Sequence, residues 1–313
     1  MIKTAIIMVT YNGWSLTEAC LNDLMPLVES GDFVIAIADN ASTDGTIEKL
    51  HSQFPLVHVY PLSKNLGFGK ANNEAIRGLL NDGIEFNTIC LLNNDTRLEP
   101  QAIKNLKQAF DKAQDDYGKV VVSPMVVNSD RTPQHNYFAG LGPMGIGSFA
   151  FLMNAIRSEQ AAAKILEGTP TPVGDFCETC WTSAVCWMLS AQLWQQTNGF
   201  DEKIFMYYED ADLALRLINL GAKFLLVNQA TITHLGGGSA KSNLSRALQH
   251  DRSQEYVFKK HFGLRGWTLS KTFRALRSLV RIMVVFPKSL IPGNKDKRDY
   301  VKIHLALFKE ALL

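Results

Sequence analysis

A single carboxylate stands at the end of an apolar run near residue 90. The stretch "CLLNNDT" (90–96) stops at two amides and one acid, Asn93, Asn94 and Asp95. Asp95 suits Mg²⁺ or Mn²⁺, because these ions prefer oxygen ligands and often take one or two carboxylates together with substrate phosphates. The alternative is a cap for the helix expected to begin near Pro100. The two amides either bind sugar hydroxyls or close the turn.

A second acidic turn follows another apolar run. Asp39 ends "FVIAIAD" (33–39) and opens a turn rich in Asn, Ser, Thr, Asp and Gly. Such turns often hold themselves together by hydrogen bonds from side chains to the backbone. A carboxylate at this place is also an acceptor for the ring N–H of uracil or thymine. Both interpretations are open from the residues alone.

A third group of candidates lies in the last third of the chain. Glu209, Asp210 and Asp212 begin a helical pattern, where the helix dipole favours carboxylates. An aspartate held there, next to the aromatic residues of "FMYYED" (205–210), is suited to act as general base for a sugar hydroxyl. His234 precedes a glycine-rich stretch; a lone histidine is usually structural, but beside a flexible loop it can ligate a metal or contact a phosphate.

These residues need a scaffold, and the first 127 residues alternate between strand-like and helix-like patterns. Continuous apolar strands separated by helices predict an α/β fold with a mostly parallel sheet covered on both faces. Ligands of such sheets bind beyond the carboxyl ends of the strands, so the polar residues after the strands are expected to converge on one crevice. The predicted strands are 4–10, 33–39, 56–60, 88–94 and 119–127, and the predicted helices are 16–28, 44–53, 69–80 and one starting near Pro100.

The pattern is less regular after residue 127. Residues 128–180 contain Gly/Pro-rich patches such as "AGLGPMGIG" (139–147), and we interpret them as an irregular lid or acceptor-side segment. The elements predicted beyond them are a strand at 181–189, a short helix capped by Ser190 and ended at Gly199, a helix at 209–221 and a strand at 223–227.

The charge is uneven along the chain. Residues 1–240 contain 16 Lys and Arg against 25 Asp and Glu, whereas residues 241–313 contain 16 against 5. Such asymmetry indicates a basic tail that faces an anionic partner. Nucleic acid is disfavoured as that partner, because no helix-turn-helix, zinc-finger or RNP-like pattern accompanies the charge. The predicted division is a catalytic domain at 1–240 and a basic helical C-terminal region at 241–313.

Within the tail, residues 267–290 admit two interpretations. The basic residues recur mostly at spacings of three, four and seven with apolar residues between them, as in a basic amphipathic helix at an anionic membrane surface. The alternative is a packed helix with a solvated basic face. The basic residues are Lys271, Arg274, Arg277, Arg281 and Lys288, and the apolar ones are Phe273, Leu276, Leu279, Val280, Met283 and Phe286.

The sequence favours a cytoplasmic protein, peripheral at the inner face of the cell membrane if the tail binds lipid. It contains no run of 18 apolar residues and starts without a signal-peptide pattern. Five cysteines do not suggest a disulfide framework. A zinc site at Cys177 and Cys180 lacks a second ligand pair, so reduced and mostly buried thiols are expected.

Six motifs stand in order along the chain: "VTYNG" (9–13), "ADNASTDGT" (38–46), "NLGFGKANN" (65–73), "LLNNDT" (91–96), "GFDEKIFMYYEDADLALRL" (199–217) and "HLGGGS" (234–239). Together they resemble the inverting glycosyltransferases of family 2, which have a GT-A fold, and especially the bacterial rhamnosyltransferase-like members. The resemblance covers about residues 3–262. One such motif is weak evidence, whereas six in order are strong.

The resemblance implies roles for individual residues. It implies that Asp210 is the catalytic base, that Asp95 and His234 hold a divalent cation, Mg²⁺ or Mn²⁺, and that Arg252 touches pyrophosphate. The implied donor-binding residues are Thr10, Tyr11, Asn12, Asp39, Asn40, Gly67, Lys70, Asn73, Asn94 and Asp95, and the implied acceptor-side residues are Trp181, Asp201, Glu202 and Glu209.

The predicted function is therefore transfer of a sugar, with inversion, from a nucleotide-diphosphate donor to a hydroxyl of a lipid-linked glycan in cell-surface polysaccharide synthesis. The resemblance favours dTDP-L-rhamnose as the donor. The alternatives are a UDP-sugar donor with the same mechanism and a non-catalytic nucleotide-binding scaffold of the same fold.

Overall fold

The structure, a computed structural model, describes most of the chain, and the described residues form two compact units. Pro100 lies outside the described residues, as does the Gly/Pro-rich patch at 139–147 apart from Gly140. The described ranges are 3–98, 101–138, 140, 170–236, 243–290 and 295–312. The first unit contains 3–137, 170–205 and 209–236, and the second contains 138, 140, 206–208, 243–290 and 295–312.

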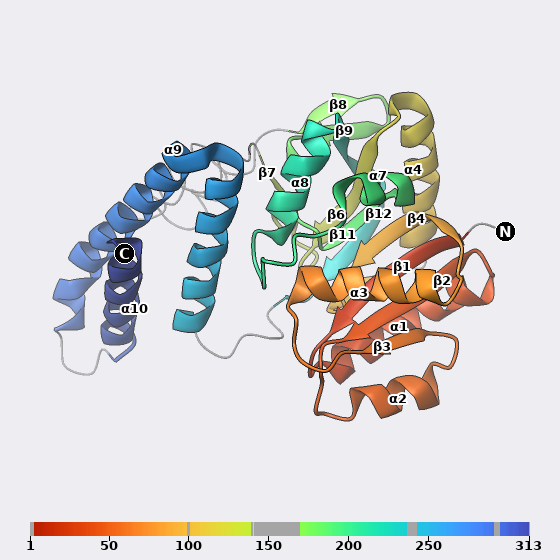
Figure 1. Cartoon of the computed structure of the whole chain (residues 1–313), viewed down its shortest axis with the longest axis horizontal. Coiled ribbons are helices and arrows are strands. Elements are labelled where there is room, and N and C mark those ends of the chain that lie inside the picture. Colours follow the sequence, from red (N-terminus) through yellow and green to blue (C-terminus); the bar gives the residue numbers. More distant parts are fainter. Residues whose placement is uncertain are drawn as a thin grey trace. The chain divides into compact units, whose positions relative to one another are not determined.

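The first unit begins with the alternation of strands and helices that the apolar runs predict (Figure 1). The fourth strand ends at Leu92, two residues earlier than predicted, so Asn93, Asn94 and Asp95 all lie in the turn after it. The elements are β1 (Lys3–Thr10), α1 (Trp14–Glu29), β2 (Phe33–Asp39), α2 (Thr46–Gln53), β3 (His58–Pro61), α3 (Phe68–Asn81), β4 (Phe86–Leu92), β5 (Thr96–Leu98), α4 (Ala102–Tyr117) and β6 (Val120–Val127).

The second half of this unit departs further from the predicted elements. The single strand predicted at 181–189 is two strands, because the chain turns at 183–185. Ser190 caps the next helix as predicted, accepting the N–H of Leu193 at 3.1 Å, but the left-handed residue that ends this helix is Asn198. The elements are β7 (Tyr137–Phe138), β8 (Thr171–Val173), β9 (Phe176–Thr179), β10 (Trp181–Thr182), β11 (Cys186–Ser190), α7 (Ala191–Thr197), α8 (Glu209–Asn219) and β12 (Lys223–His234).

The main sheet has the order β3-β2-β1-β4-β11-β6-β12-β9-β8. The strands β3, β2, β1, β4, β6 and β12 run in one direction, and β11 lies antiparallel between β4 and β6. The predicted mostly parallel sheet is confirmed. The short strand β5 pairs antiparallel with the end of β12, with Thr96 opposite His234. Parallel strands end at the same edge of a sheet, so this edge collects the segments that follow β1, β2, β4 and β6.

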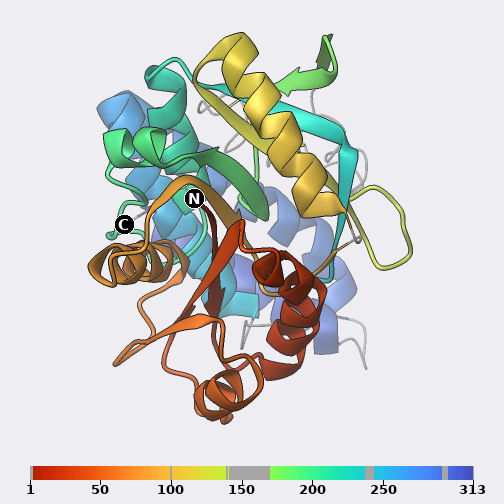
Figure 2. The same ribbon diagram turned by 90° about the vertical axis from the view of Figure 1, so that its right-hand side faces the viewer.

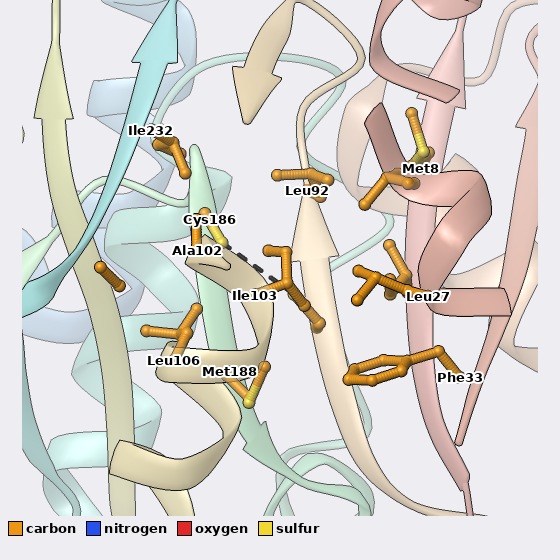
Figure 3. Close-up of a cluster of buried hydrophobic side chains, with 14 of the residues drawn as sticks. Met8, Leu27, Phe33, Leu92, Ala102, Ile103, Leu106, Cys186, Met188 and Ile232 are labelled. Atoms are coloured by element: carbon orange, nitrogen blue, oxygen red, sulfur yellow. Dashed lines mark hydrogen bonds between the residues drawn. The ribbon is translucent and has the colours of Figure 1, made fainter. Parts of the chain in front are cut away.

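Helices cover both faces of this sheet, as Figure 2 shows. On one face α1 and α4 pack on alternate residues of the strands, such as Met8 of β1 and Met188 of β11 (Figure 3). On the other face lie α3 and α7, with α8 packed against both of these helices. The strand interior is almost wholly apolar because both faces are buried.

The five cysteines are free. Cys20, Cys90 and Cys186 are buried, Cys177 is half-buried and Cys180 is exposed. The expectation of mostly buried, unpaired thiols is confirmed.

The second unit is helical. Its long helix α9 (Asn243–Ser289) is bent at Gly263, whose φ of 62° is not helical, and α10 (Lys295–Leu312) packs along it (Figure 1). Within the described residues, no helix is long and apolar enough to cross a membrane.

The expectation that the basic residues of 267–290 share an outward face is wrong for two of them. Arg274 and Arg277 are only 1% and 5% exposed. Arg274 Nη2 donates to Glu255 Oε2 at 2.7 Å, and Arg277 Nη2 donates to both carboxylate oxygens of Asp251 at 3.1 Å. Buried charges need such partners, so these arginines belong to the interior of the helical unit.

Candidate functional site

Three strand ends meet at one edge of the sheet of the first unit. Thr10, the last residue of β1, pairs with Asp39, the last residue of β2, and the N–H of Asn40 donates to the carbonyl of Thr10 at 2.8 Å. From the turn after β4, Asn94 Nδ2 donates to Thr17 Oγ1 at 2.9 Å and to Thr10 Oγ1 at 3.4 Å. The predicted convergence of these segments is confirmed.

Asp39 has one satisfied and one unsatisfied carboxylate oxygen. The side chain is fully buried, and Oδ1 accepts the N–H of Ser42 at 2.8 Å, which closes the turn. Oδ2 is also buried, and among the described residues it has no hydrogen-bond partner. An unsatisfied buried carboxylate oxygen is costly, so a ligand N–H that reached it would be strongly favoured. Asp39 thus serves the turn with one oxygen and offers the other to a ligand.

The turn after β1 is fixed to the turn after β2. Asn12, with a φ of 49°, accepts the N–H of Thr43 at 2.7 Å through Oδ1, and its own N–H donates to Ser42 Oγ at 2.9 Å. Tyr11, next to it, is half-buried. The side-chain oxygen of Asn12 therefore sets the shape of the loop in which Tyr11 lies.

The loop before α3 is fixed to the end of β2. Asn40 Nδ2 donates to the carbonyl of Gly67 at 3.1 Å, and Oδ1 of Asn40 accepts the N–H of Leu66 at 2.7 Å. Gly67 has a φ of 83°, and a Cβ built on it would lie 1.9 Å from the carbonyl oxygen of Phe205. Only glycine fits that close approach, so this loop, predicted to contact the nucleotide, is rigidly placed.

The predicted residues Lys70, Asn73 and Glu202 form one network on α3. The amide of Asn73 donates to the carbonyl of Phe200 at 2.9 Å and accepts the N–H of Phe200 at 3.0 Å. Lys70 Nζ lies 2.8 Å from Glu202 Oε2, and Arg77 donates to the other oxygen of Glu202. Partial burial works to raise the pKa of Glu202, but the hydrogen bonds from Lys70, Arg77 and Asn73 outweigh it and lower the pKa to about 2. These groups hold the segment 200–202 on α3.

Asp95 and His234, far apart in sequence, lie together. Asp95 Oδ1 and His234 Nε2 are 3.2 Å apart, and both side chains are largely buried. The pairing of Thr96 with His234 in the β5–β12 ladder brings them to this distance, helped by the N–H of Leu235, which donates to the carbonyl of Asp95 at 2.9 Å. Two ligands at right angles on one octahedral cation with 2.0–2.1 Å bonds lie about 3.0 Å apart, so this spacing fits two ligands of Mg²⁺ or Mn²⁺.

Gln134 orients the ring of His234, and sequence reasoning missed it. Gln134 Nε2 donates to Asn128 Oδ1 at 2.9 Å and to the carbonyl of His234 at 3.2 Å, so its Oε1 accepts from His234 Nδ1, 2.6 Å away. The network therefore places a proton on Nδ1 and leaves Nε2 facing Asp95. The loop 128–136 follows β6, another strand that ends at this edge, which was the available signal.

No third acidic or thiolate ligand joins this pair within the described ranges, where no cluster of three His, Cys, Asp or Glu residues has the geometry to hold a metal ion. Two protein ligands suit a cation whose remaining positions are filled by phosphate oxygens and water. Asp95 and His234 therefore fit the predicted divalent cation if phosphate oxygens and water supply its remaining ligands.

Glu209 and Asp210 open α8 in different surroundings. Asp210 is half-buried, its Oδ1 accepts the N–H of Ala211 at 2.8 Å, and its Oδ2 accepts the N–H of Ala184 at 3.3 Å. Glu209 is buried, and its Oε2 has no hydrogen-bond partner among the described residues. Burial, and secondly the negative charge of Asp210, raise the pKa of Glu209 to about 8. At neutral pH the pair therefore divides into a neutral acid, Glu209, and a carboxylate, Asp210.

The loop that contacts Asp210 also reaches β4. The N–H of Asn93 donates to the carbonyl of Val185 at 2.9 Å, one residue after Ala184. The start of α8 and the turn that carries Asp95 are thus tied to the same short segment, 183–185. Asp210 belongs to the same edge of the sheet as the Asp95–His234 pair.

Three predicted residues remain, and the described contacts of each involve other groups. Trp181 is buried in β10, and Asp201 Oδ1 accepts the N–H of Lys203 at 3.0 Å within its own turn. Arg252 lies in the second unit and donates to Glu310 at 2.8 Å. Their predicted roles toward the acceptor and the pyrophosphate stay predictions.

Comparison with known proteins places this edge in a functional context. A family model described as glycosyl transferase family 2 matches residues 5–176. An N-acetylglucosaminyl-diphospho-decaprenol L-rhamnosyltransferase of Mycobacterium tuberculosis is 29% identical over 297 residues, covering 87% of this chain and 91% of that protein. A dTDP-rhamnosyl transferase, RfbF, of Shigella flexneri is 22% identical over 288 residues, covering 91% of this chain and 88% of that protein.

A solved structure shares the fold. The crystal structure of residues 1–349 of S. aureus TarS aligns with a TM-score of 0.52 at 15% sequence identity, covering 99% of this chain and 81% of that one. With the mostly parallel sheet and the C-terminal helices, this likeness confirms the GT-A-like fold class that the motifs imply.

Proposed function

The chain belongs to glycosyl transferase family 2, and we propose that it transfers L-rhamnose from dTDP-L-rhamnose, with inversion, to a hydroxyl of a lipid-linked glycan. The names of the relatives support a rhamnosyl donor and a lipid diphosphate acceptor. The observation that carries the proposal is the 3.2 Å pairing of Asp95 Oδ1 with His234 Nε2 at the strand-end edge that also holds Asp39.

Asp39 would recognise the base of the donor. Its buried Oδ2 is an acceptor without a partner among the described residues, and thymine offers one ring N–H at N3. Because the turns after β1 and β2 are hydrogen-bonded to each other through Asn12, the acceptor is fixed before the nucleotide arrives. Because the acceptor is already ordered, little conformational entropy is lost when the nucleotide binds.

Asp95 and His234 would hold a divalent cation together with the donor diphosphate. When bound, such a cation offsets the charge that develops on the leaving diphosphate. Gln134 keeps the lone pair of His234 Nε2 directed at the site. Asp95 is held in turn by the β5–β12 pairing, so neither ligand has to move to meet the donor.

Asp210 would act as the general base. It takes the proton of the acceptor hydroxyl while the oxygen forms a bond to the anomeric carbon, the bond to the diphosphate breaks, and the nucleoside diphosphate leaves. Attack opposite the leaving group inverts the anomeric centre. The N–H groups of Ala184 and Ala211 orient the carboxylate, and the neutral state of Glu209 leaves Asp210 as the charged member of the pair.

A UDP-sugar is one alternative donor, because Asp39 Oδ2 can accept the same hydrogen bond from it. Uracil presents the same N3–H as thymine, so Asp39 accepts a UDP-sugar by the same contact. The non-catalytic scaffold is the second alternative; it retains nucleotide binding but has no use for a base at Asp210.

The experiment measures release of nucleoside diphosphate and transfer of sugar to a polyprenyl-diphosphate-linked N-acetylglucosamine. dTDP-L-rhamnose and a set of UDP-sugars are compared with the wild type in the presence of Mn²⁺ or Mg²⁺. Asp210→Asn is expected to lower turnover by about 10²–10⁴-fold, the usual contribution of a general base, while nucleotide binding measured by calorimetry is retained.

Asp116→Asn, an exposed aspartate on α4, is the matched control and is expected to keep full activity. Near wild-type turnover by Asp210→Asn would show that Asp210 is not the base. Turnover with UDP-sugars alone would select the alternative donor. Nucleotide binding with no transfer to any lipid-linked acceptor would favour the scaffold.

A further inference from the structure

The second half of α9 has an apolar outer face. From Leu276 to Leu290, every side chain that the structure describes as exposed is apolar. The large ones, beginning two turns earlier at Leu269, are 39–67% exposed, an unusual fraction for residues of this kind. They are Leu269, Leu276, Leu279, Met283, Val284, Phe286 and Leu290.

These side chains lie on one stripe of the helix. Leu269, Leu276, Met283 and Leu290 follow one another at intervals of seven residues, and Leu279 and Phe286 come three residues after the second and third of them. At 100° per residue such positions lie on one side of a helix. The stripe from Leu269 to Leu290 therefore extends over about six turns of the helix.

Several polar residues of the same part of the helix point inward. Arg274 and Arg277 are buried against Asp251 and Glu255, and Ser270 Oγ contacts Gln254 Oε1 at 3.2 Å. Ser278 is also buried. A helix whose inner face carries ion pairs and whose outer face carries leucine, methionine and phenylalanine is inverted relative to a water-facing helix of a globular protein.

Its neighbour α10 shows the ordinary arrangement. Val301, His304 and Leu307 of α10 are buried, whereas Lys297 and Lys302 are exposed. Among the described residues, α10 has two exposed large apolar side chains, Leu305 and Leu312, whereas α9 has a long row of them.

The charge of the unit identifies the partner. Residues 241–313 contain 16 Lys and Arg against 5 Asp and Glu. Even if all 5 acidic residues were paired with basic ones, a large positive excess would remain. Arg265, four residues before Leu269 and therefore on the same side of the helix, is exposed. An apolar stripe that begins beside a cation, on a unit with this positive excess, fits the interface of an anionic bilayer.

We propose that the apolar stripe 269–290 of α9 docks on an anionic lipid bilayer, lying in the interface with Arg265 at the headgroups. A second copy of the chain is the rival occupant, because positions seven apart also occur in coiled coils. Only two of its heptads, starting at Leu276 and at Met283, have an apolar residue at both paired positions, fewer than the three to four that indicate a coiled coil. Pairing two such units would also bring two large positive charges together.

The test is flotation of the full chain with vesicles of phosphatidylcholine alone or with 30% phosphatidylglycerol. The wild type is expected to float with the anionic vesicles. Met283→Glu/Phe286→Glu is expected to lower the partition coefficient by about 30-fold or more, since it removes two inserted side chains and adds two repelled charges. These vesicles contain no glycan acceptor, so the result is independent of transferase activity.

The matched control is Leu305→Glu/Leu312→Glu, which makes the same change of charge at exposed apolar positions of α10. It is expected to keep most of the binding. An equal loss of vesicle binding in the two variants would mean that only the net charge of the unit matters, and it would overturn the proposal. Absence of vesicle binding by the wild type would overturn it too, and a dimer in light scattering that Met283→Glu/Phe286→Glu dissociates would assign the stripe to a second copy.

A second measurement separates insertion from adsorption, and melting curves confirm that each variant folds. Met283→Trp is expected to gain fluorescence that brominated lipid quenches, whereas Leu305→Trp is expected not to. Equal quenching at both positions would contradict a stripe-specific contact.

Discussion

The buried carboxyl of Glu209 makes the stability of the first unit depend on pH. Its pKa is raised from 4.5 to about 8, first by burial and second by the charge of Asp210. The native state therefore keeps a proton that the unfolded chain releases above pH 4.5. The resulting stabilisation is fully present below pH 4.5 and is lost as the pH rises through about 8.

The size of the effect follows from the same two values. In that window the free energy of unfolding falls by about 1.4 kcal/mol per pH unit, or roughly 3–5 kcal/mol in all. Glu209→Gln keeps the shape of the side chain without a titrating proton. We expect its stability to be independent of this group, so that its advantage over the wild type grows steadily between pH 5 and pH 8.

The assay is urea denaturation of the wild type and Glu209→Gln at each pH unit from 5 to 9, followed by tryptophan fluorescence, to which four of the five tryptophans contribute from the first unit. Glu202→Gln is the matched control, because ion pairs with Lys70 and Arg77 lower the pKa of Glu202 to about 2. Stabilisation from Glu202 is present above pH 4.5 and is lost only as the pH falls toward 2, so its variant should differ from the wild type by a constant amount from pH 5 to 9. Parallel curves for the wild type and Glu209→Gln would refute the reasoning.

Three further changes test the parts of the site. Gly67→Ala is expected to destabilise the first unit by several kcal/mol in the same denaturation assay, because its Cβ would meet the carbonyl of Phe205. Gly83→Ala is the control: Gly83 also has a positive φ, but a Cβ there meets no other atom. It should cost only the roughly 1–2 kcal/mol of a left-handed residue. Gln134→Leu is expected to weaken Mn²⁺ binding by about 10–100-fold in calorimetry with dTDP present, and an unchanged affinity would remove Gln134 from the site. His234→Ala should abolish any rise in melting temperature that Mn²⁺ gives with dTDP, while the rise from dTDP alone persists.

The elements that carry the site could be read from the sequence because they are buried on both faces. The strands β1, β2 and β4 are nearly pure apolar runs, and helices of clear period separate them. Strand direction then fixes the edge at which Thr10, Asp39 and Asp95 appear. Those three positions follow from local pattern and one rule of sheet topology.

The contacts that complete the site could not be read in the same way. β5 has three residues, with Arg97 exposed between Thr96 and Leu98, so its sequence has no strand period to detect. Yet its pairing with β12 sets the distance between Asp95 and His234. Gln134 lies in a loop whose sequence resembles any polar turn, and only the tertiary structure shows that its amide faces His234.

For α9, the sequence correctly predicts an amphipathic helix, but the predicted orientation of its basic side is wrong. Spacing alone identifies an amphipathic helix with basic and apolar residues, but it does not say which side faces the neighbouring helix. Here Asp251 and Glu255, earlier in α9, pair with Arg274 and Arg277 and so draw the basic side inward. Since an arginine buried without a carboxylate would cost several kcal/mol, these two acids decide the orientation. Replacing Asp251 and Glu255 with leucine is therefore expected to leave both arginines without a carboxylate partner and to favour exposure of the basic side.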